Sequence, residues 1–185
     1  MRGKVDKCEP QVLMKIVNFE FKARLRNEAL VRSVLKRLRA RYVGEDHQTD
    51  TYFKVAHGRL KVREGNIENA LIFYQRANAS RARRSTVEMM PLAPRNSVKK
   101  VLSRALGILA VVDKRREIYF VENVKIHLDR VRGLGKFVEV EAISRAGGIK
   151  QARRMALEFR KLFRIPTTDI LAESYSDLVM QKLRR

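Results

Sequence analysis

The sequence predicts an α+β fold in which eight antiparallel β-strands alternate with amphipathic helices. Three observations support this prediction. Polar and apolar residues alternate with a period of two in short segments, which is the pattern of strands with one apolar face. In other segments, apolar residues recur every three or four positions, as in helices that pack on one side. Tight turns separate several successive strands, and such turns join antiparallel neighbours.

The N-terminal part contains one strand and one helix. Residues 1–15 show no period and are predicted to be a loose leader. Residues 17–25 place apolar side chains at every second position and are predicted to be the first strand. Leucines and valines at helical spacing then predict an amphipathic helix over residues 28–41, with Asn27 as its N-cap.

The middle of the chain supplies four more strands. Residues 49–64 are predicted to form a hairpin that turns at His57-Gly58 and contains the second and third strands. A fourth strand is expected over residues 70–77 and a fifth over residues 83–90.

The C-terminal part begins with a helix over residues 96–106, which Gly107 ends. Three strands connected by short turns follow, at residues 109–121, 124–131 and 136–144. A last amphipathic helix is predicted over residues 149–163, and residues 169–182 are expected to form a short docked helix or turn.

The chain has 185 residues and a formal net charge of +21. The length predicts a single domain over residues 1–185, and the positive charge predicts a polyanionic partner, either nucleic acid or a phosphate-rich small molecule. No apolar run approaches about 18 residues, so no membrane-spanning helix is expected. The N-terminus lacks the apolar region of a secretory signal, and the single cysteine, Cys8, excludes a disulfide framework. Together these features predict a cytoplasmic protein.

The polar faces of the predicted strands are segregated by charge. The side chains concerned are Glu20 and Lys22, Lys61 and Arg63, Tyr74 and Arg76, Lys114 and Arg116, His127 and Asp129, and Glu139 and Glu141. If the strands close into a barrel, these groups point inward as a basic sector beside a cluster of carboxylates. Basic groups bind phosphate oxygens, and carboxylates are hard ligands for Mg²⁺ or Mn²⁺. A solvated strand face explains any single pair, but the combination over six strands favours a site.

Several of these segments, in their order along the chain, carry a family resemblance. They lie at residues 18–22, 50–64, 71–76, 112–121, 127–141 and 174–178. The first, Asn-Phe-Glu-Phe-Lys, resembles the Glu-x-Glu-x-Lys opening strand of the CYTH, or triphosphate tunnel, superfamily. This superfamily includes class IV adenylyl cyclases and thiamine triphosphatases. The other segments are similar to its later strands and its tail, so the resemblance covers nearly the whole chain.

The resemblance implies an eight-stranded antiparallel closed β-barrel, or tunnel, with helices packed outside and a phosphorylated substrate bound with Mg²⁺ or Mn²⁺. It implies metal ligands at Glu20, Asp129, Glu139 and Glu141. It implies phosphate-binding residues at Lys22, Lys61, Arg63, Arg76, Arg84, Lys114 and Arg116. It also places Tyr52 and Arg76 where triphosphatases of the family use a Tyr–Lys pair to activate water.

Two residues depart from the family pattern. Asn18 replaces the first Glu, and a neutral oxygen donor there predicts that one metal site is weaker or missing. Arg76 stands where a Lys is common. Because Arg stays protonated, a Tyr52–Arg76 pair is a poor base, which argues against hydrolysis by that route. Core packing explains Tyr52 equally well.

Two functions from different classes are therefore predicted. The first is a metal-dependent enzyme acting on triphosphate-containing substrates, either a phosphohydrolase (triphosphatase) or a class IV adenylyl cyclase-like enzyme. The alternative is a non-catalytic binding module for polyphosphate, nucleotide or RNA. RNA readers display exposed aromatic side chains, whereas Phe19 and Phe21 lie on the apolar face, so nucleic acid ranks below a nucleotide or polyphosphate as the partner. A monomer or homodimer is expected.

Two expectations concern the distribution of charge. Crowded positive charge in the tunnel predicts that Arg63→Ala raises thermal stability. Most of the net charge lies outside the predicted tunnel. Residues 149–164, the predicted helix and one residue beyond it, carry one acidic residue, Glu158, among the basic residues Lys150, Arg153, Arg154, Arg160, Lys161 and Arg164.

Overall fold

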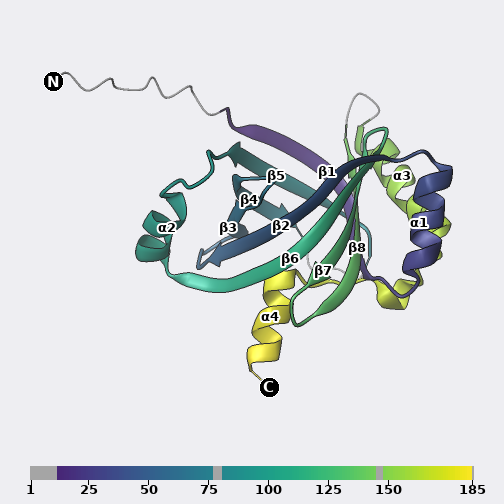
Figure 1. The fold of residues 1–185 in the computed structure, drawn as a ribbon. Helices are drawn as coiled ribbons and strands as arrows, with labels where there is room; N and C mark the ends of the chain where they lie inside the picture. The colour runs from purple at the N-terminus through teal and green to yellow at the C-terminus, as the bar shows by residue number, and fades with distance from the viewer. Residues whose placement is uncertain (1–11, 77–80, 145–147, 185) are drawn as a thin grey trace.

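Eight β-strands close into an antiparallel barrel in the computed structural model, which describes residues 12–76, 81–144 and 148–184 (Figure 1). The strands are β1 (Met14–Arg24), β2 (Arg41–Phe53), β3 (Arg59–Glu64), β4 (Ala70–Arg76), β5 (Arg83–Pro91), β6 (Ile108–Val121), β7 (Val124–Val131) and β8 (Gly135–Ile143). Their order around the barrel is β1-β5-β4-β3-β2-β6-β7-β8, and β8 pairs with β1 to close it. The predicted fold class is confirmed.

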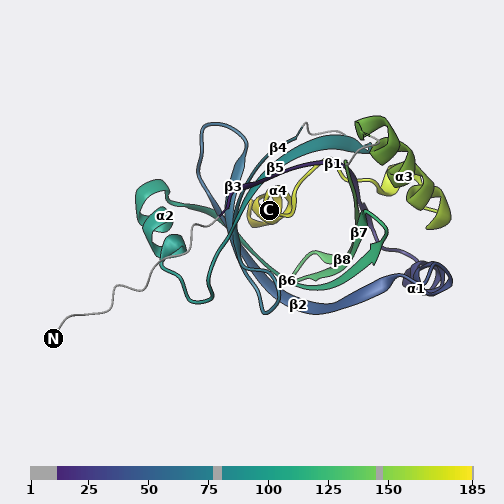
Figure 2. The same ribbon diagram turned by 90° about the horizontal axis from the view of Figure 1, so that it is seen from above.

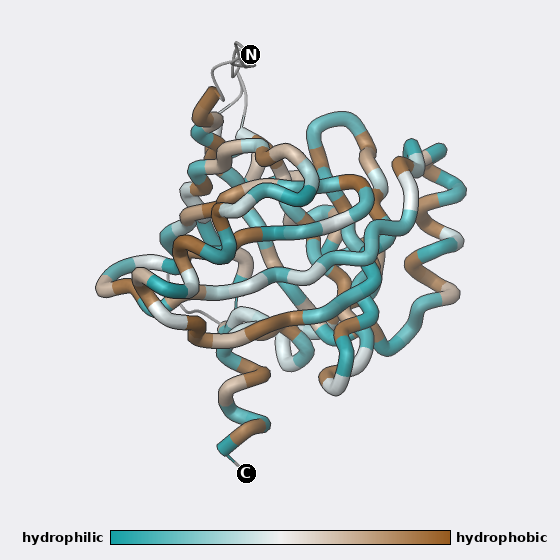
Figure 3. Tube along the Cα trace, turned by 60° about the vertical axis from the view of Figure 1, so that its left-hand side comes forward, coloured by the Kyte–Doolittle hydropathy of each residue, from teal (hydrophilic) through white to brown (hydrophobic). Residues whose placement is uncertain are grey.

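The barrel wall carries many charged residues on its inner face and is apolar on the flank that two helices cover. On β1, Glu20 and Lys22 line the interior, whereas Phe21 packs outside. The helices α1 (Glu28–Arg37) and α3 (Gly148–Leu162) pack over the outward residues of β1, β7 and β8. Hydrophilic and hydrophobic stretches are interspersed along the strands because each strand serves both faces (Figure 3). The largest apolar core therefore lies between the barrel wall and the two helices, and the interior has room for charged groups.

The other two helices lie elsewhere on the barrel. On the opposite flank, α2 (Val98–Leu106) packs near Phe53 of β2. After a 3-10 turn (Thr167–Asp169), α4 (Tyr175–Leu183) lies at one end of the barrel and falls within its outline when viewed from above (Figure 2). The start of α4, where Tyr175 lines the cavity, therefore covers one end of the interior.

The first strand begins earlier than predicted. Met14 and Lys15 belong to β1, where they pair with Met89 and Glu88 of β5. The rest of the predicted leader up to residue 11, and the last residue of the predicted strand 70–77, lie outside the described residues. Within the described chain, no helix is long and apolar enough to cross a membrane.

The second strand begins earlier than predicted, at Arg41 rather than near residue 49. The preceding helix ends at Arg37, and Arg39 has a φ of 50°, a left-handed conformation that cannot continue the helix. The added part of β2 buries Asp46 and Gln48 on the side of the interior. The buried positions in this half of β2 are polar. The sequence there lacks the alternation of apolar and polar residues that would predict a strand.

Candidate functional site

A cavity of about 300 Å³ lies inside the barrel. Antiparallel strands bring distant residues together there because alternate side chains of every strand face the same interior. Most of the predicted site residues line it, namely Glu20, Lys22, Tyr52, Lys61, Arg63, Arg76, Arg116, Glu139 and Glu141. The cavity has a side that is rich in carboxylates and another that is rich in cations.

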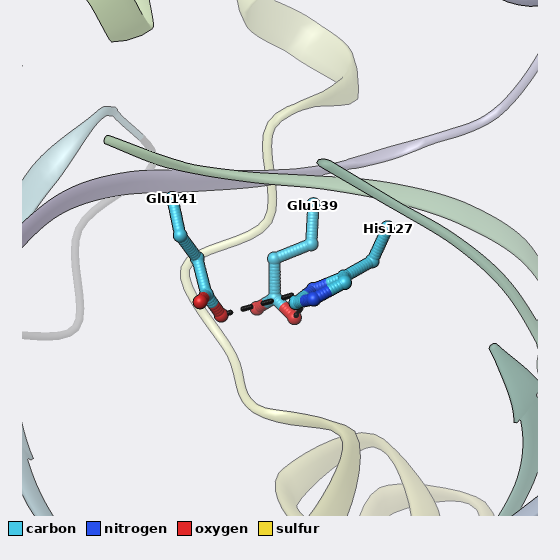
Figure 4. Close-up of side chains that lie close together, drawn as sticks. All are labelled: His127, Glu139 and Glu141. Carbon is cyan, nitrogen blue, oxygen red and sulfur yellow. Dashed lines mark ion pairs between the residues drawn. The ribbon is translucent and has the colours of Figure 1, made fainter. Parts of the chain in front are cut away.

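On the carboxylate side, three side chains of β7 and β8 point toward a common space (Figure 4). Ligand atoms of His127, Glu139 and Glu141 all lie within 4.8 Å of one another. His127 Nδ1 is 3.6 Å from Glu139 Oε2 and 3.8 Å from Glu141 Oε1. Glu20 of β1 stands opposite Glu141 in the strand register, so it borders the same cluster.

This cluster has the chemistry of a divalent-cation site. Burial, together with the charge of Glu139, raises the pKa of Glu141 to about 7. Burial, with Arg116 nearby, lowers the pKa of His127 to about 3, so the ring is neutral and able to ligate a metal. Among the described residues, neither ring nitrogen of His127 has a hydrogen-bond partner. A metal ion would satisfy the imidazole and neutralise the neighbouring carboxylates, so the cluster could bind one.

Glu139 is held in place by two cations. Lys22 Nζ lies 3.1 Å from Glu139 Oε1, and Arg116 Nη2 donates to Glu139 Oε2 at 2.8 Å. Arg116 also donates to both oxygens of Asp129, at 2.7 and 2.6 Å, and Tyr175 Oη donates to Asp129 Oδ2 at 2.6 Å. Asp129, predicted as a metal ligand, is fully buried and is not part of the cavity lining. The structure instead places it as the partner that orients Arg116.

On the basic side, Asp50 binds three cations at once. Its Oδ2 accepts hydrogen bonds from Lys61 Nζ at 2.8 Å and from Lys114 Nζ at 2.7 Å. Arg63 donates to both carboxylate oxygens, at 2.8 and 3.0 Å. Burial alone would raise the pKa of Asp50, but Arg63 and the two lysines hold it well below its usual value. Lys114, predicted to bind phosphate, lies buried at Asp50 and away from the cavity surface, so it supports Asp50.

A second carboxylate, Glu68, reaches this side from the turn between β3 and β4. Arg63 Nη1 donates to Glu68 Oε2 at 2.9 Å, and Lys125 donates to the other oxygen. Buried Asp46 holds the turn, because its carboxylate accepts from the backbone N–H groups of Ile67 and Glu68 at 2.9 and 3.0 Å. Asp50 and Glu68 thus compensate cations for which the sequence pattern indicated no partner.

Arg63→Ala is therefore expected to lower thermal stability, the reverse of the expectation from sequence. The change removes partners from Asp50 and Glu68, and breaking such a buried pair costs about 3 kcal/mol of the free energy of unfolding. Thermal denaturation in phosphate-free buffer measures it, with Arg104→Ala on exposed helix α2 as the control. If Arg63→Ala leaves the melting temperature unchanged or raises it, Arg63 is instead repelled by the neighbouring cations, as the sequence predicted.

Lys61, and not Arg76 as predicted, is the cation that contacts the Tyr52 hydroxyl. Lys61 Nζ donates to Tyr52 Oη at 3.4 Å, while Arg76 Nη1 donates to Glu20 Oε1 at 2.8 Å. Burial, with Arg63 nearby, lowers the pKa of Lys61 to about 8, and burial raises the pKa of Tyr52 well above its usual value. Lys61 can therefore lose a proton near neutral pH, which Arg76 cannot do.

The register of β5 places Arg83, rather than Arg84, on the inner face. Arg83 stands opposite Glu20 of β1, and Arg84 stands opposite Phe19. Arg83 is buried and its Nη1 donates to the carbonyl oxygen of Leu171 at 3.2 Å, whereas Arg84 is exposed on the outside. The assignment of Arg84 to the tunnel is corrected by one residue, because a shift of one position reverses the face of a strand.

The end of the cavity away from Tyr175 is apolar. Along β1 the inward residues change from Lys22, which lies 3.7 Å from the centre of the Tyr175 ring, through Glu20 and Asn18 to Ile16. The other apolar lining residues are Ile72, Val87, Met89, Phe120 and Ile143. An organic group attached to phosphates in the ionic middle of the cavity would contact this apolar end.

Several cavity residues were not assigned from the sequence. Asp50 lies two positions before Tyr52 on one strand, so strand alternation alone could have placed it on the same face. His127 was placed on a polar face but given no ligand role. Glu68 sits in a turn and Tyr175 at a helix start, where no period indicates which way a side chain points.

Comparison with known proteins relates the chain to a family. The sequence profile described as the CYTH domain matches residues 17–175. A protein of Methanocaldococcus jannaschii that bears the name "putative adenylate cyclase" is 24% identical over 173 residues, which cover 88% of this chain and 98% of that protein.

Solved structures share the fold at low sequence identity. The PH1012 protein of Pyrococcus horikoshii has a TM-score of 0.73 and 21% identity, over 87% of this chain and 98% of that chain. A Hippeastrum protein, described as an adenylyl cyclase candidate that reveals a dominant triphosphatase activity, has a TM-score of 0.58 and 14% identity. That match covers 92% of this chain and 96% of the Hippeastrum chain.

Proposed function

Because this chain belongs to the CYTH domain family, we propose that it is a divalent-metal-dependent enzyme that hydrolyses the terminal phosphoryl group of a triphosphate bound inside the barrel. One observation carries the proposal: the cluster of His127, Glu139 and Glu141 shares a single cavity with a wall of cations. The cluster offers ligands to a metal ion, and the wall offers N–H donors to phosphate oxygens. Phosphoryl transfer relies on both kinds of group.

The metal would be held by Glu139, Glu141 and His127, with Glu20 beside them. When bound, Mn²⁺ or Mg²⁺ neutralises phosphate oxygens and polarises a phosphorus–oxygen bond. A nitrogen ligand favours Mn²⁺ of the two, because Mg²⁺ prefers oxygen ligands. Asn18 lines the cavity with a neutral amide where the family has a carboxylate, which supports one strong metal site rather than two.

The phosphate ligands in this proposal are Lys22, Arg63, Arg76 and Arg116, which all line the cavity. Carboxylates within the barrel already bind each of them. These contacts fix long side chains in place, so less conformational entropy is lost when a triphosphate binds. The arrangement supports binding of a polyanion whose oxygens share the cations with the carboxylates.

Lys61 is the proposed general base. In its neutral form it accepts a proton from the attacking water, while Tyr52 stays protonated and positions the Lys61 amine. This pair removes the objection that Arg76 raises against hydrolysis.

Lys61→Arg is expected to lower kcat by about 100-fold, with KM changed by less than about threefold. The variant keeps the positive charge but cannot release its proton. In the parent enzyme, kcat rises with pH through about 8 as Lys61 loses its proton, and this rise is absent in the variant. Steady-state rates between pH 6 and 10 test it. Full kcat with an unchanged pH profile would exclude Lys61 as the base.

A substrate panel tests the function itself. Inorganic triphosphate, thiamine triphosphate and ATP are each supplied with Mg²⁺ or Mn²⁺, and phosphate and cyclic AMP are measured separately. Metal-dependent phosphate release is the expected result. Formation of cyclic AMP and pyrophosphate from ATP would replace the hydrolase with a cyclase, and triphosphate binding without either product would make the barrel a binding module. A lower KM for thiamine triphosphate and ATP than for inorganic triphosphate would show that the apolar end of the cavity contacts the organic group of the substrate.

A further inference from the structure

The outward face of α3 carries a dense stripe of positive charge. Ala152, Ala156 and Phe159 bury the opposite face against the barrel. The basic residues of the outward face are Lys150, Arg153, Arg154, Arg160, Lys161 and, just past the helix, Arg164, and the only acidic residue among them is Glu158. Their spacings of three, four and seven positions keep them on one side of the helix. From residue 150 to residue 164 the stripe extends about 21 Å, at 1.5 Å per residue.

Five of these cations are exposed and lack acidic partners. Within the described chain, no carboxylate lies within 4.0 Å of the charged nitrogens of Lys150, Arg153, Arg154, Lys161 or Arg164, all of which are exposed. Arg160 differs, since it donates to Ile165 O at 3.2 Å and to Thr167 Oγ1 at 2.9 Å. We define the five exposed cations as the α3 basic stripe. Positive charge gathered at this density without counter-ions favours a polyanion as ligand.

Exposed cations on β6, on β7 and in the turn after β7 provide a contrast. Arg115 pairs with Glu45 at 3.4 Å, Arg130 with Glu28 at 3.4 Å, and Arg132 with Asp113 at 3.7 Å. These three arginines are as exposed as the α3 basic stripe, but their charge is locally compensated. The α3 basic stripe therefore differs from these other exposed cations in having no carboxylate partners within the described part of the chain, and the protein's net charge alone does not explain this difference.

We propose that the α3 basic stripe binds the phosphate backbone of a nucleic-acid duplex without regard to sequence. Three of its five residues are Arg, whose planar fork of donors matches phosphate oxygens. The face presents no aromatic side chain for base stacking, since Phe159 and Phe163 are buried, which argues against a single-strand platform. Its apolar groups are half-buried Leu157 and exposed Leu162, too few for insertion into a membrane surface.

The stripe is separate from the cavity. In Figures 1 and 2, α3 lies outside the barrel, against β1 and β8. The inner faces of these strands carry Glu20, Glu139 and Glu141, and an apolar layer that includes Phe21 and Val140 lies between the wall and the helix. A duplex bound to the stripe therefore does not occupy the cavity, and the inference does not rest on the proposed enzymatic activity.

The test measures binding of the full chain to a fluorescein-labelled DNA duplex of about 20 base pairs by fluorescence anisotropy at several salt concentrations. The variant Arg153→Ala/Arg154→Ala/Lys161→Ala removes three charges from the stripe. The matched control, Arg115→Ala/Arg130→Ala/Arg132→Ala, removes three charges from β6, β7 and the turn after β7. We expect the stripe variant to raise Kd at least about tenfold and to reduce the slope of log K against log salt by about 2.7, at about 0.9 per phosphate contact. The control should change Kd by less than about threefold.

Three outcomes would overturn the inference. Equal losses in the stripe variant and the control would show that net charge alone drives binding. Displacement of the duplex by saturating inorganic triphosphate with Mn²⁺, together with parental binding by the stripe variant, would place the duplex at the cavity. Binding to phosphatidylserine vesicles is measured for the same variants. If the stripe variant loses vesicle binding but binds the duplex like the parent, the stripe is a membrane-binding surface. Arg154→Glu alone, with a melting temperature equal to that of the parent, checks that reduced binding does not arise from misfolding.

Discussion

Glu141→Gln is expected to reduce the metal-dependent release of phosphate from inorganic triphosphate by about 100-fold or more, while the fold survives. Glu141 contributes a carboxylate oxygen to the cluster with Glu139 and His127. The amide keeps the size of the side chain but loses the charge that attracts a divalent cation. The melting temperature of the metal-free protein should stay equal or rise, because the change removes one of two carboxylates that repel each other.

A direct measurement of metal binding separates this result from a general loss of activity. Mn²⁺ should raise the melting temperature of the parent, because a ligand that binds only the folded state stabilises it. The same addition should have little effect on Glu141→Gln. Glu45→Gln, at an exposed carboxylate on the outside of β2, is the matched control and should behave like the parent. Mn²⁺-dependent turnover at the parental rate in Glu141→Gln would remove this residue from the metal site.

Asp50→Asn is expected to destabilise the protein by about 3–5 kcal/mol of the free energy of unfolding. Asp50 is 1% exposed and accepts hydrogen bonds from Lys61, Arg63 and Lys114. The amide is neutral, so the cations lose a shared counter-ion in a place that water reaches poorly. Urea denaturation measures the loss, and the slope of unfolding free energy against urea should not change.

Asp113→Asn provides the comparison for Asp50→Asn. Asp113 is also a strand aspartate and pairs with His47 and Arg132, but it lies at the surface, where an ion pair contributes about 1 kcal/mol or less. Inorganic triphosphate should raise the melting temperature of Asp50→Asn more than that of the parent, because its oxygens replace the missing charge. If the two variants were equally stable, Asp50 would not be the counter-ion that stabilises Lys61, Arg63 and Lys114.

The strand faces could be predicted because the side-chain period of a strand is two. Alternation on β1 placed Glu20 and Lys22 together opposite Phe19 and Phe21, and the structure has this arrangement. Arg84 was assigned from the family resemblance rather than from alternation, and the register of β5 puts it opposite Phe19, on the outer face. Predictions of this kind are therefore as accurate as the strand register on which they depend.

The roles of individual side chains inside the barrel depended on partners that are distant in the chain. Lys61, Arg63 and Lys114 resembled three free phosphate ligands, but Asp50 binds all of them. Asp129 matched a metal ligand in sequence, but it binds Arg116 and Tyr175. Each of these ion pairs and hydrogen bonds joins different elements of the chain, so no local pattern could indicate it.

The sequence by itself determined the antiparallel strands, the segregation of charge on their faces and the family to which the chain belongs. These features follow from local periodicity and from ordered motifs, which are properties of neighbouring residues. Only the tertiary structure decided that Lys61 is the partner of Tyr52, that His127 joins Glu139 and Glu141, and that carboxylates already compensate the cationic wall. The physical reason is barrel closure, which fixes the register between strands and so determines which charges meet in a water-poor interior.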